Sequence, residues 1–241
     1  MKALHMNQMP GKALSLSIGA DGSVWQIGTG CTGAGLGIYR WKDSDWEPVE
    51  GAAVGLAVGP TGEPWSWNLY GQIYRREGET WREMPGIARY IAIGADGSVW
   101  HVGTVETFYT GYGLYRWCGD HWEQVAGAAV GIAVAPDGTP WHWNRIGEIY
   151  KREGDTWRPM PGRATHLAIG ADGSMWHIGT DQRGETGYGI YKCYQGAWEQ
   201  VEGAGIGIAV GPDGVPWWWT AHGDIYKAKQ PMKVSTRWAT R

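Results

Sequence analysis

Short apolar segments alternate with turn residues along the whole chain. Leu56-Ala57-Val58-Gly59 is a compact apolar segment, and Pro60-Thr61-Gly62-Glu63 carries turn residues directly after it. Large and small side chains then alternate over Pro64-Trp65-Ser66-Trp67-Asn68, which is the period of two expected of a strand. Gln72-Ile73-Tyr74-Arg75 and Thr80-Trp81-Arg82-Glu83 supply two more strands. Since no segment shows an amphipathic helical period over about 11 residues, the pattern predicts an all-β chain of short antiparallel strands.

This unit recurs six times along the chain. Each copy contains a turn dipeptide that ends in glycine and begins at Asp21, Thr61, Asp96, Asp137, Asp172 or Asp213. A glycine lies ten residues before each of these positions, at Gly11, Gly51, Gly86, Gly127, Gly162 and Gly203. A tryptophan lies four residues after each, at Trp25, Trp65, Trp100, Trp141, Trp176 and Trp217. A tyrosine then follows in an apolar-Tyr-basic triplet, at Tyr39, Tyr74, Tyr115, Tyr150, Tyr191 and Tyr226.

Long and short copies alternate. Successive turn positions are 40, 35, 41, 35 and 41 residues apart. The extra length lies between the tryptophan and the tyrosine, which are 14 or 15 residues apart in odd copies and 9 in even ones. The chain is therefore three tandem copies of a doublet, and each odd copy carries a longer loop.

Four strands in a unit of about 40 residues are typical of a β-propeller blade, so six units predict a six-bladed ring of four-stranded antiparallel blades. Residues 1–241 are then a single domain. Its expected blades are approximately residues 15–54, 55–89, 90–130, 131–165, 166–206 and 207–241 plus 1–14. The Asp-Gly dipeptides suit hairpin turns, because Asp tolerates positive φ and Gly adopts it freely, and they lack the carboxylate series of a calcium loop.

The two ends of the chain complete one blade together. Met9-Pro10-Gly11 matches Met84-Pro85-Gly86 and Met160-Pro161-Gly162, which belong to the ends of even copies. Trp238 resembles the outer-strand tryptophan of the sixth copy, although it lies 12 residues after Tyr226, where the other copies have 7. We therefore expect the N-terminal and C-terminal segments to pair and close the ring, which removes exposed sheet edges.

Composition and charge exclude several classes of protein. The chain has 18 Trp, one Phe and 40 Gly, and 43% of its residues are hydrophobic, which excludes a disordered segment. The net charge is −3 with both signs interspersed, so no electrostatic footprint for nucleic acid or an anionic membrane is present. Without a run of about 20 apolar residues or an evident signal peptide, we expect a cytoplasmic protein that does not insert into membranes.

The titratable residues do not predict a catalytic or metal site. Cys31, Cys118 and Cys193 share no CxxC spacing and are expected to be free thiols. In a propeller the first strand of each blade lines the axis, and His166 is the one residue of these six strands that titrates near neutral pH. We therefore expect no enzyme, no metal and no cofactor. The histidines on second strands are spread among blades and are expected to be structural; they are His101, His142 and His177.

Aromatic residues beyond the shared framework are the candidates for function. The tryptophans present in every copy are expected to fill the wedge between neighbouring blades. A second tryptophan occurs in even copies alone, and two of these three are followed by asparagine. Burial between blades and exposure beside the long loops are both open for these rings. An exposed ring with polar neighbours is the combination that a sugar face needs. The predicted carbohydrate-binding residues are Trp67, Asn68, Tyr112, Trp143, Asn144, Tyr188 and Trp219.

The repeat resembles the tectonin repeat of the tachylectin-1, fish egg lectin and fungal tectonin group. The resemblance rests on a Trp-led outer strand, Pro-Gly or Glu-Gly, an apolar strand, Gly-x-Asp-Gly-x-x-Trp and Ile-Tyr-Arg or Ile-Tyr-Lys, over all six copies. It implies a propeller that binds glycans on bacterial or invertebrate surfaces, including methylated sugars and lipopolysaccharide, through sites between blades. The disulfides of secreted animal members are missing here.

Taken together, these features predict a non-enzymatic, multivalent lectin with up to three similar sites, one per doublet, able to agglutinate glycan-coated surfaces. Each site is expected to pair a long odd loop with an aromatic residue of a neighbouring even blade. A propeller scaffold that binds proteins or peptides is the alternative, and an enzyme that depends on His166 is a third. The sugar and the oligomeric state are open.

Overall fold

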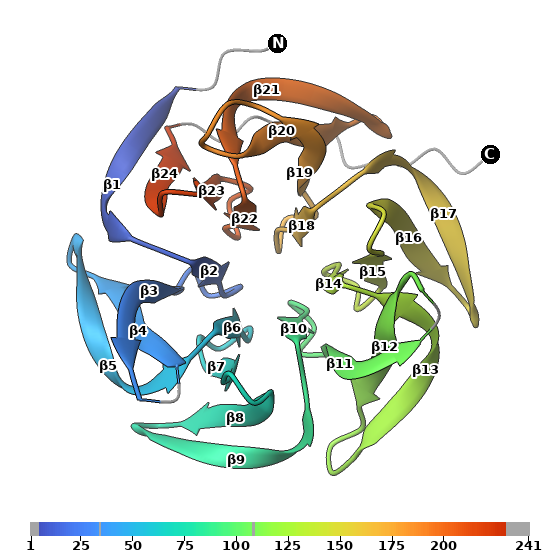
Figure 1. Cartoon of the computed structure of the whole chain (residues 1–241), viewed down its shortest axis with the longest axis horizontal. Coiled ribbons are helices and arrows are strands. Elements are labelled where there is room, and N and C mark those ends of the chain that lie inside the picture. Colours follow the sequence, from blue (N-terminus) through green and yellow to red (C-terminus); the bar gives the residue numbers. More distant parts are fainter. Residues whose placement is uncertain (1–4, 34, 108, 230–241) are drawn as a thin grey trace.

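Six four-stranded antiparallel sheets surround a central axis in the computed structural model (Figure 1). The structure describes residues 5–33, 35–107 and 109–229. Within these residues every regular element is a strand, and there is no helix long and apolar enough to cross a membrane. The predicted all-β six-bladed propeller is confirmed.

The first strand of each of the first three blades lies innermost and the fourth outermost (Figure 1). Blade 1 consists of β2 (Ser15–Ile18), β3 (Val24–Thr32), β4 (Gly35–Lys42) and β5 (Asp45–Ala53). Blade 2 consists of β6 (Gly55–Val58), β7 (Pro64–Trp67), β8 (Gln72–Glu77) and β9 (Thr80–Ile87). Blade 3 consists of β10 (Tyr90–Ile93), β11 (Val99–Thr107), β12 (Gly111–Trp117) and β13 (Trp122–Ala129).

The other three blades repeat this order, except that the last takes its outer strand from the N-terminal segment. Blade 4 consists of β14 (Gly131–Val134), β15 (Pro140–Trp143), β16 (Glu148–Glu153) and β17 (Thr156–Arg163). Blade 5 consists of β18 (His166–Ile169), β19 (Met175–Gln182), β20 (Tyr188–Tyr194) and β21 (Ala197–Gly205). Blade 6 consists of β22 (Gly207–Val210), β23 (Pro216–Trp219), β24 (Asp224–Ala228) and β1 (Met6–Lys12).

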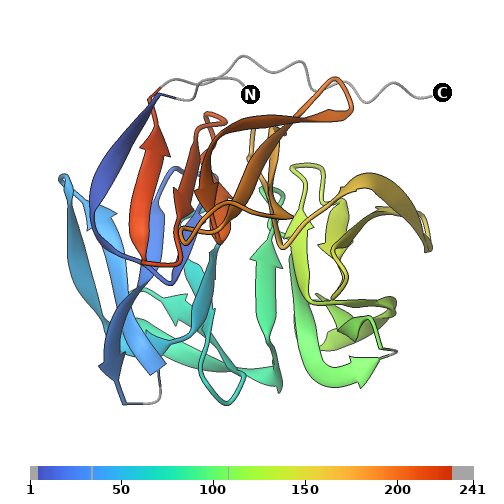
Figure 2. The same ribbon diagram turned by 45° about the horizontal axis from the view of Figure 1, so that its top comes forward.

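The strands run between two faces of the ring (Figure 2). Because neighbouring strands are antiparallel, the turns that join first to second strands lie on one face, which we call the Asp-Gly face. Its turns are residues 19–23, 59–63, 94–98, 135–139, 170–174 and 211–215. The opposite face carries the loops that join second to third strands and the connections between blades, and we call it the long-loop face.

The two ends of the chain close the ring, as predicted. β1 pairs antiparallel with β24, and this register aligns Met6 with Ala228 and Gln8 with Tyr226. Met6 thus occupies the register position at which the other five blades have their outer-strand tryptophan. Trp238, which the sequence suggested for this position, lies outside the described residues. Met6 packs against the cluster that contains the buried Trp218, whose ring stacks on Tyr226 at 5.6 Å.

Neighbouring blades are joined by a repeated hydrogen bond from the outer tryptophans. The indole Nε1–H of each donates to a backbone carbonyl of the preceding blade over 2.6–2.8 Å. The five pairs are Trp46–Pro10, Trp81–Glu50, Trp122–Pro85, Trp157–Ala126 and Trp198–Pro161.

A glycine with positive φ follows each of these carbonyls, for example Gly86 at φ +93°. A Cβ at Gly86 would lie 2.9 Å from Cδ1 of Trp122, so a side chain there would collide with the ring. At these five positions the glycine is therefore required both by the backbone bulge and by the close approach of the indole.

An aromatic collar narrows the central channel at the long-loop face. We define it as Trp67, Tyr90, Trp143, His166 and Trp219, whose successive ring centroids are 5.4–5.8 Å apart. Tyr90 and His166 are joined by a 3.1 Å hydrogen bond between the hydroxyl and Nε2. Beyond the collar lies a cavity of about 130 Å³ lined mainly by the first strands.

The indole of each collar tryptophan lies against the glycine at which the first strand of its own blade begins. A Cβ at Gly55, Gly131 or Gly207 would overlap the benzene edge of the adjacent indole. The three odd blades have Ser15, Tyr90 and His166 at this position. Even blades therefore contribute a second-strand tryptophan to the collar, and odd blades contribute the first residue of their first strand. Ser15 of blade 1 has no ring, so the collar is interrupted there.

Three buried histidines form a second layer between the blades. The rings of His101, His142 and His177 stack on a tyrosine of the third strand at 4.7–4.9 Å and contact the outer tryptophan at 4.2–4.4 Å. Their Nδ1 atoms have no hydrogen-bond partner within the described residues. Burial lowers the pKa of His101 and His142 to about 4 and that of His177 to about 3.

These histidines predict a loss of stability in acid. Between pH 6.5 and about 4 the unfolded chain binds protons that the folded chain excludes, so the free energy of unfolding falls as the pH falls through this window. Blade 1 has Gln26 at this position, so we choose Gln as the replacement for all three histidines. The substitution should reduce the free energy of unfolding that is lost in acid by up to about 3 kcal/mol per residue. Urea unfolding at pH 7, 5.5 and 4.5 measures the effect, and identical slopes for variant and parent would contradict it.

The collar tryptophans predict a second stability effect. Trp143 is 2% exposed, so Trp143→Ala removes a fully buried ring and should lower the free energy of unfolding by roughly 3–5 kcal/mol. Tyr109→Ala, at a side chain that is 94% exposed, is the control and should change it by under about 0.5 kcal/mol. Equal melting temperatures for the two variants would show that the collar does not support the ring.

Candidate ligand-binding clefts between the blades

The structure places the sequence-predicted tryptophans and asparagines in supporting positions. Trp67, Trp143 and Trp219 are 7%, 2% and 3% exposed in the collar, so their faces are covered by other residues. Asn68 and Asn144 are buried, and each Oδ1 accepts two backbone N–H groups of its own turn. These five side chains hold the collar and the turns behind it.

The two sequence-predicted tyrosines lie where a long odd loop meets the next even blade. Tyr112 and Tyr188 are half-buried on the long-loop face. The backbone of two even turns bonds to the neighbouring long loop, with Arg145 N–H donating to the Thr110 carbonyl at 2.8 Å and Ala221 N–H to the Thr186 carbonyl at 3.0 Å. Two long loops are therefore joined to even blades through the residue that follows the position of Asn144 in the repeat, and not through the tryptophan.

The residue two positions after the repeated tyrosine lies at a junction between blades, and its type differs between odd and even blades. Odd blades have Trp41, Trp117 and Cys193 there, and even blades have Arg76, Arg152 and Ala228. Where an even blade precedes an odd one, the odd residue packs on the inner tryptophan, as Trp117 does on Trp65 at 5.8 Å and Trp41 on Trp217 at 6.0 Å. These junctions are filled by apolar contacts.

A cleft opens where blade 1 precedes blade 2. Arg76 takes the place of the tryptophan, and its guanidinium lies 5.9 Å from the ring of Trp25 and 5.4 Å from that of Trp81. The cleft has a volume of about 510 Å³ and lies toward the Asp-Gly face, since the turn residues Thr61–Pro64 form one wall. Four carboxylates line it together with Arg40 and Arg76; they are Glu47, Glu50, Glu63 and Glu79.

Two buried donors at this junction have no partner within the described residues. They are Nε1 of Trp25 and Nη1 of Arg76. The same two donors are unpartnered where blade 3 precedes blade 4, at Nε1 of Trp100 and Nη1 of Arg152. A buried donor without an acceptor costs about 1–3 kcal/mol. The pairing of an unpartnered indole N–H with an unpartnered guanidinium N–H therefore recurs at two equivalent junctions.

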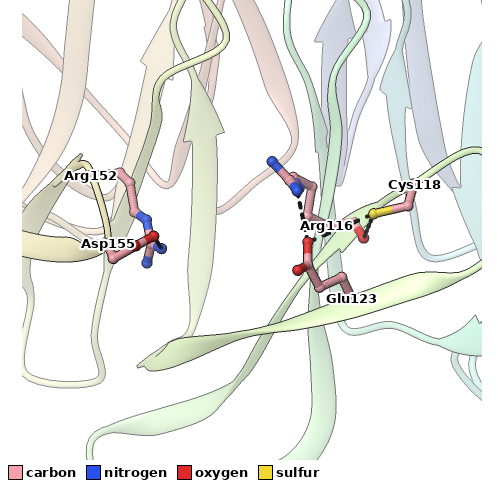
Figure 3. Close-up of polar contacts among 5 residues, drawn as sticks. All are labelled: Arg116, Cys118, Glu123, Arg152 and Asp155. Carbon is pink, nitrogen blue, oxygen red and sulfur yellow. Dashed lines mark hydrogen bonds and ion pairs between the residues drawn. The ribbon is translucent and has the colours of Figure 1, made fainter.

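Part of this charge pattern recurs at the junction of blades 3 and 4 (Figure 3), where Ala126 and Thr139 stand in place of Glu50 and Glu63. Arg152 on β16 pairs with Asp155 at 3.2 Å, and Arg116 on β12 pairs with Glu123 at 2.7 Å. The hydrogen bond to Glu123 raises the pKa of Arg116, so this guanidinium stays charged. Cys118 Sγ is 3.8 Å from the same carboxylate. Cations and carboxylates thus alternate across both junctions.

The third equivalent junction, between blades 5 and 6, is closed. Ala228 replaces the arginine and Val215 lies in the turn where blade 2 has Glu63, and both are buried in one apolar cluster with Trp176. Trp176 Nε1 lacks a partner here too, but no arginine accompanies it. The threefold repeat of the chain therefore produces two junctions with an arginine and unpartnered donors rather than three, and the one between blades 1 and 2 holds the cleft of about 510 Å³.

The chemistry of the clefts is that of binding through hydrogen bonds. Guanidinium and indole N–H groups donate, and carboxylates accept. Among residues 5–33, 35–107 and 109–229, no group of three or more His, Cys, Asp or Glu could hold a metal ion. The sequence-based prediction missed these clefts. The signal that could have revealed them is the alternation of Trp or Cys with Arg two residues after the repeated tyrosine.

Comparisons with known proteins place the chain within the propellers. The family model described as Tectonin domain matches residues 30–113 and 89–186. No curated protein matches the chain by sequence. Among solved structures, the chain is similar to regucalcin, a calcium-binding protein from Agrobacterium tumefaciens, with a TM-score of 0.66 and 12% identity over 98% of this chain and 97% of that one.

Two further solved structures share the architecture. A streptogramin B lyase has a TM-score of 0.61 and 14% identity over 93% of this chain and 97% of that one. The WD40 β-propeller domain of Doa1 has a TM-score of 0.60 and 10% identity over 94% and 97%. Identities this low show a common fold alone. The two Tectonin matches together span residues 30–186, more than half of the chain, and the protein belongs to the Tectonin domain family.

Proposed function

We propose that this protein is a non-catalytic, multivalent lectin that binds one saccharide unit at each of two junctions, in the cleft between blades 1 and 2 and at the equivalent place between blades 3 and 4. The observation that carries the proposal is the pair of buried donors without partners, an indole N–H and a guanidinium N–H, that recurs at these two junctions. Membership of the Tectonin family supports it.

A saccharide suits the chemistry of the clefts. Each sugar hydroxyl both donates and accepts, so a wall with guanidinium donors and carboxylate acceptors can satisfy several hydroxyls of one ring. The cleft of about 510 Å³ is within the range of small-molecule sites. A single sugar of this kind binds near millimolar, about −4 kcal/mol, and two clefts on one ring gain affinity for a surface that displays many copies.

A protein-binding scaffold is the second candidate, because the exposed apolar residues are confined to one face. Every large hydrophobic side chain that is exposed within the described residues belongs to a loop, strand end or connection of the long-loop face. These residues are Leu14, Leu69, Tyr70, Ile87, Val105, Tyr109 and Ile146. Such a surface is typical of an interaction site between proteins.

The arginines of the clefts provide the test. Arg76→Gln with Arg152→Gln removes the charged donors from both clefts and should weaken glycan binding at least tenfold, because a hydrogen bond to a charged group is worth about 1.5–3 kcal/mol. A glycan array identifies the ligand, and calorimetry should give two sites in the parent and one in each single variant. Arg82→Gln with Arg158→Gln removes the same charge from outer-strand ion pairs and should bind as the parent does.

Three results would contradict the proposal. An array without binding above background to any glycan excludes the lectin. Three equal sites by calorimetry would show that the closed junction of blades 5 and 6 also binds. Unchanged affinity in the double variant would move the site away from the clefts.

A further inference from the structure

On the long-loop face, two arginines from different blades flank one tyrosine. Tyr112 lies at the start of β12, Arg89 in the connection from β9 to β10, and Arg145 in the turn after β15. The guanidinium carbon of Arg89 is 4.3 Å from the centroid of the Tyr112 ring, and that of Arg145 is 5.6 Å from it. Three neighbouring segments of the ring thus bring two positive charges to one aromatic surface.

One of the two charges is not neutralised. Arg145 forms a 2.7 Å ion pair with Glu106 and donates to the Tyr109 carbonyl at 3.3 Å, so its side chain is held in place by the long loop of blade 3. Arg89 is exposed, and no carboxylate of the described residues lies within 4.0 Å of it. The contact with Tyr112 orients its planar guanidinium, and the residue as a whole is exposed to solvent.

The framework of the ring does not require these arginines. The equivalent positions in the first doublet are Leu14, Leu36 and Leu69, and in the third doublet they are Thr165, Tyr188 and Ala221. All three doublets form four-stranded blades, although the third takes its last outer strand from β1. The two cations are therefore an addition to one doublet, and their role lies outside folding.

We propose that Arg89 and Arg145 bind an anionic carboxylate or phosphate group of a small ligand, with the Tyr112 ring as the floor of the site. A guanidinium fork matches the two oxygens of such a group and binds them with charge-assisted hydrogen bonds. Ile146, next to Arg145 in the chain, and Tyr109, whose carbonyl accepts from Arg145, both have exposed apolar side chains that are available to the apolar part of such a ligand. The site lies on the face opposite to the clefts and does not depend on them.

The probes are glucuronate, glucose 6-phosphate, inorganic phosphate and neutral methyl glucoside. Nitrogen-15 NMR follows the arginine Nε–H signals during each titration. The three anions, or one class of them, should give saturable shifts of the Arg89 signal, and methyl glucoside should give none. A response to glucuronate alone identifies a carboxylate site, and a response to the phosphates alone identifies a phosphate site.

Three variants separate the site from general charge attraction. Arg89→Gln with Arg145→Gln should weaken anion binding about tenfold or more. Arg89→Leu with Arg145→Leu, which installs the residues native to the first doublet, should fold and bind equally poorly. Arg82→Gln with Arg158→Gln removes the same net charge elsewhere and should bind as the parent does. The proposal is overturned by the absence of a saturable shift with every anion, or by an equal loss in the Arg82 and Arg158 control.

Discussion

The hydrogen bond from an outer tryptophan to the carbonyl before a bulge glycine is the contact on which the ring depends. Sheets are held together by their own backbone bonds, but nothing in a single sheet specifies the angle to its neighbour. The bond from Trp122 to the Pro85 carbonyl does so, because Gly86 lets the indole approach the bulged strand closely. Five junctions use this contact. The sixth junction, between blades 5 and 6, is built differently: β1, the strand that closes the ring, has Met6 in place of the tryptophan, and the buried Trp218 packs near Gly203.

Because this contact sets the spacing of the blades, other positions are free to differ between doublets. Trp117 fills one junction, and Arg152, at the same repeat position, leaves the next one polar. A tryptophan at this position fills the junction and gains apolar contacts. An arginine there lies among aromatic rings and leaves N–H donors without an acceptor. The long-loop face varies in the same way, with leucines in the first doublet where the second has Arg89 and Arg145. The framework therefore repeats sixfold, while the chemistry that can recognise a ligand changes from one junction to the next.

Much of the fold could be predicted from the sequence, but less of the candidate site. The turn glycines and the period of two located the strands, and the match of Met9-Pro10-Gly11 to even copies predicted the pairing of the ends. The match did not reveal that β1 places Met6 at the outer tryptophan position. Tyr112 was predicted as a site residue and lies between two arginines, yet neither Arg89 nor Arg145 was singled out, since both come from other copies of the repeat. Asn68 and Asn144 were predicted to contact a ligand, and in the structure each accepts backbone N–H groups of its own turn, a role that a residue pattern does not reveal.

The sequence by itself determined the number of blades, the order of strands within each blade and the residues that join them, because these depend on contacts that recur at constant spacing. It did not determine which aromatic rings are exposed. Trp67, Trp143 and Trp219 became buried only because the first strands of the even blades begin with glycine and the six blades converge on one axis. The clefts are likewise a product of the tertiary structure, since Trp25 and Arg76 belong to different copies and meet only when blade 1 packs on blade 2. Local periodicity encodes the sheets, whereas a site made by side chains of neighbouring sheets exists only after the ring has closed.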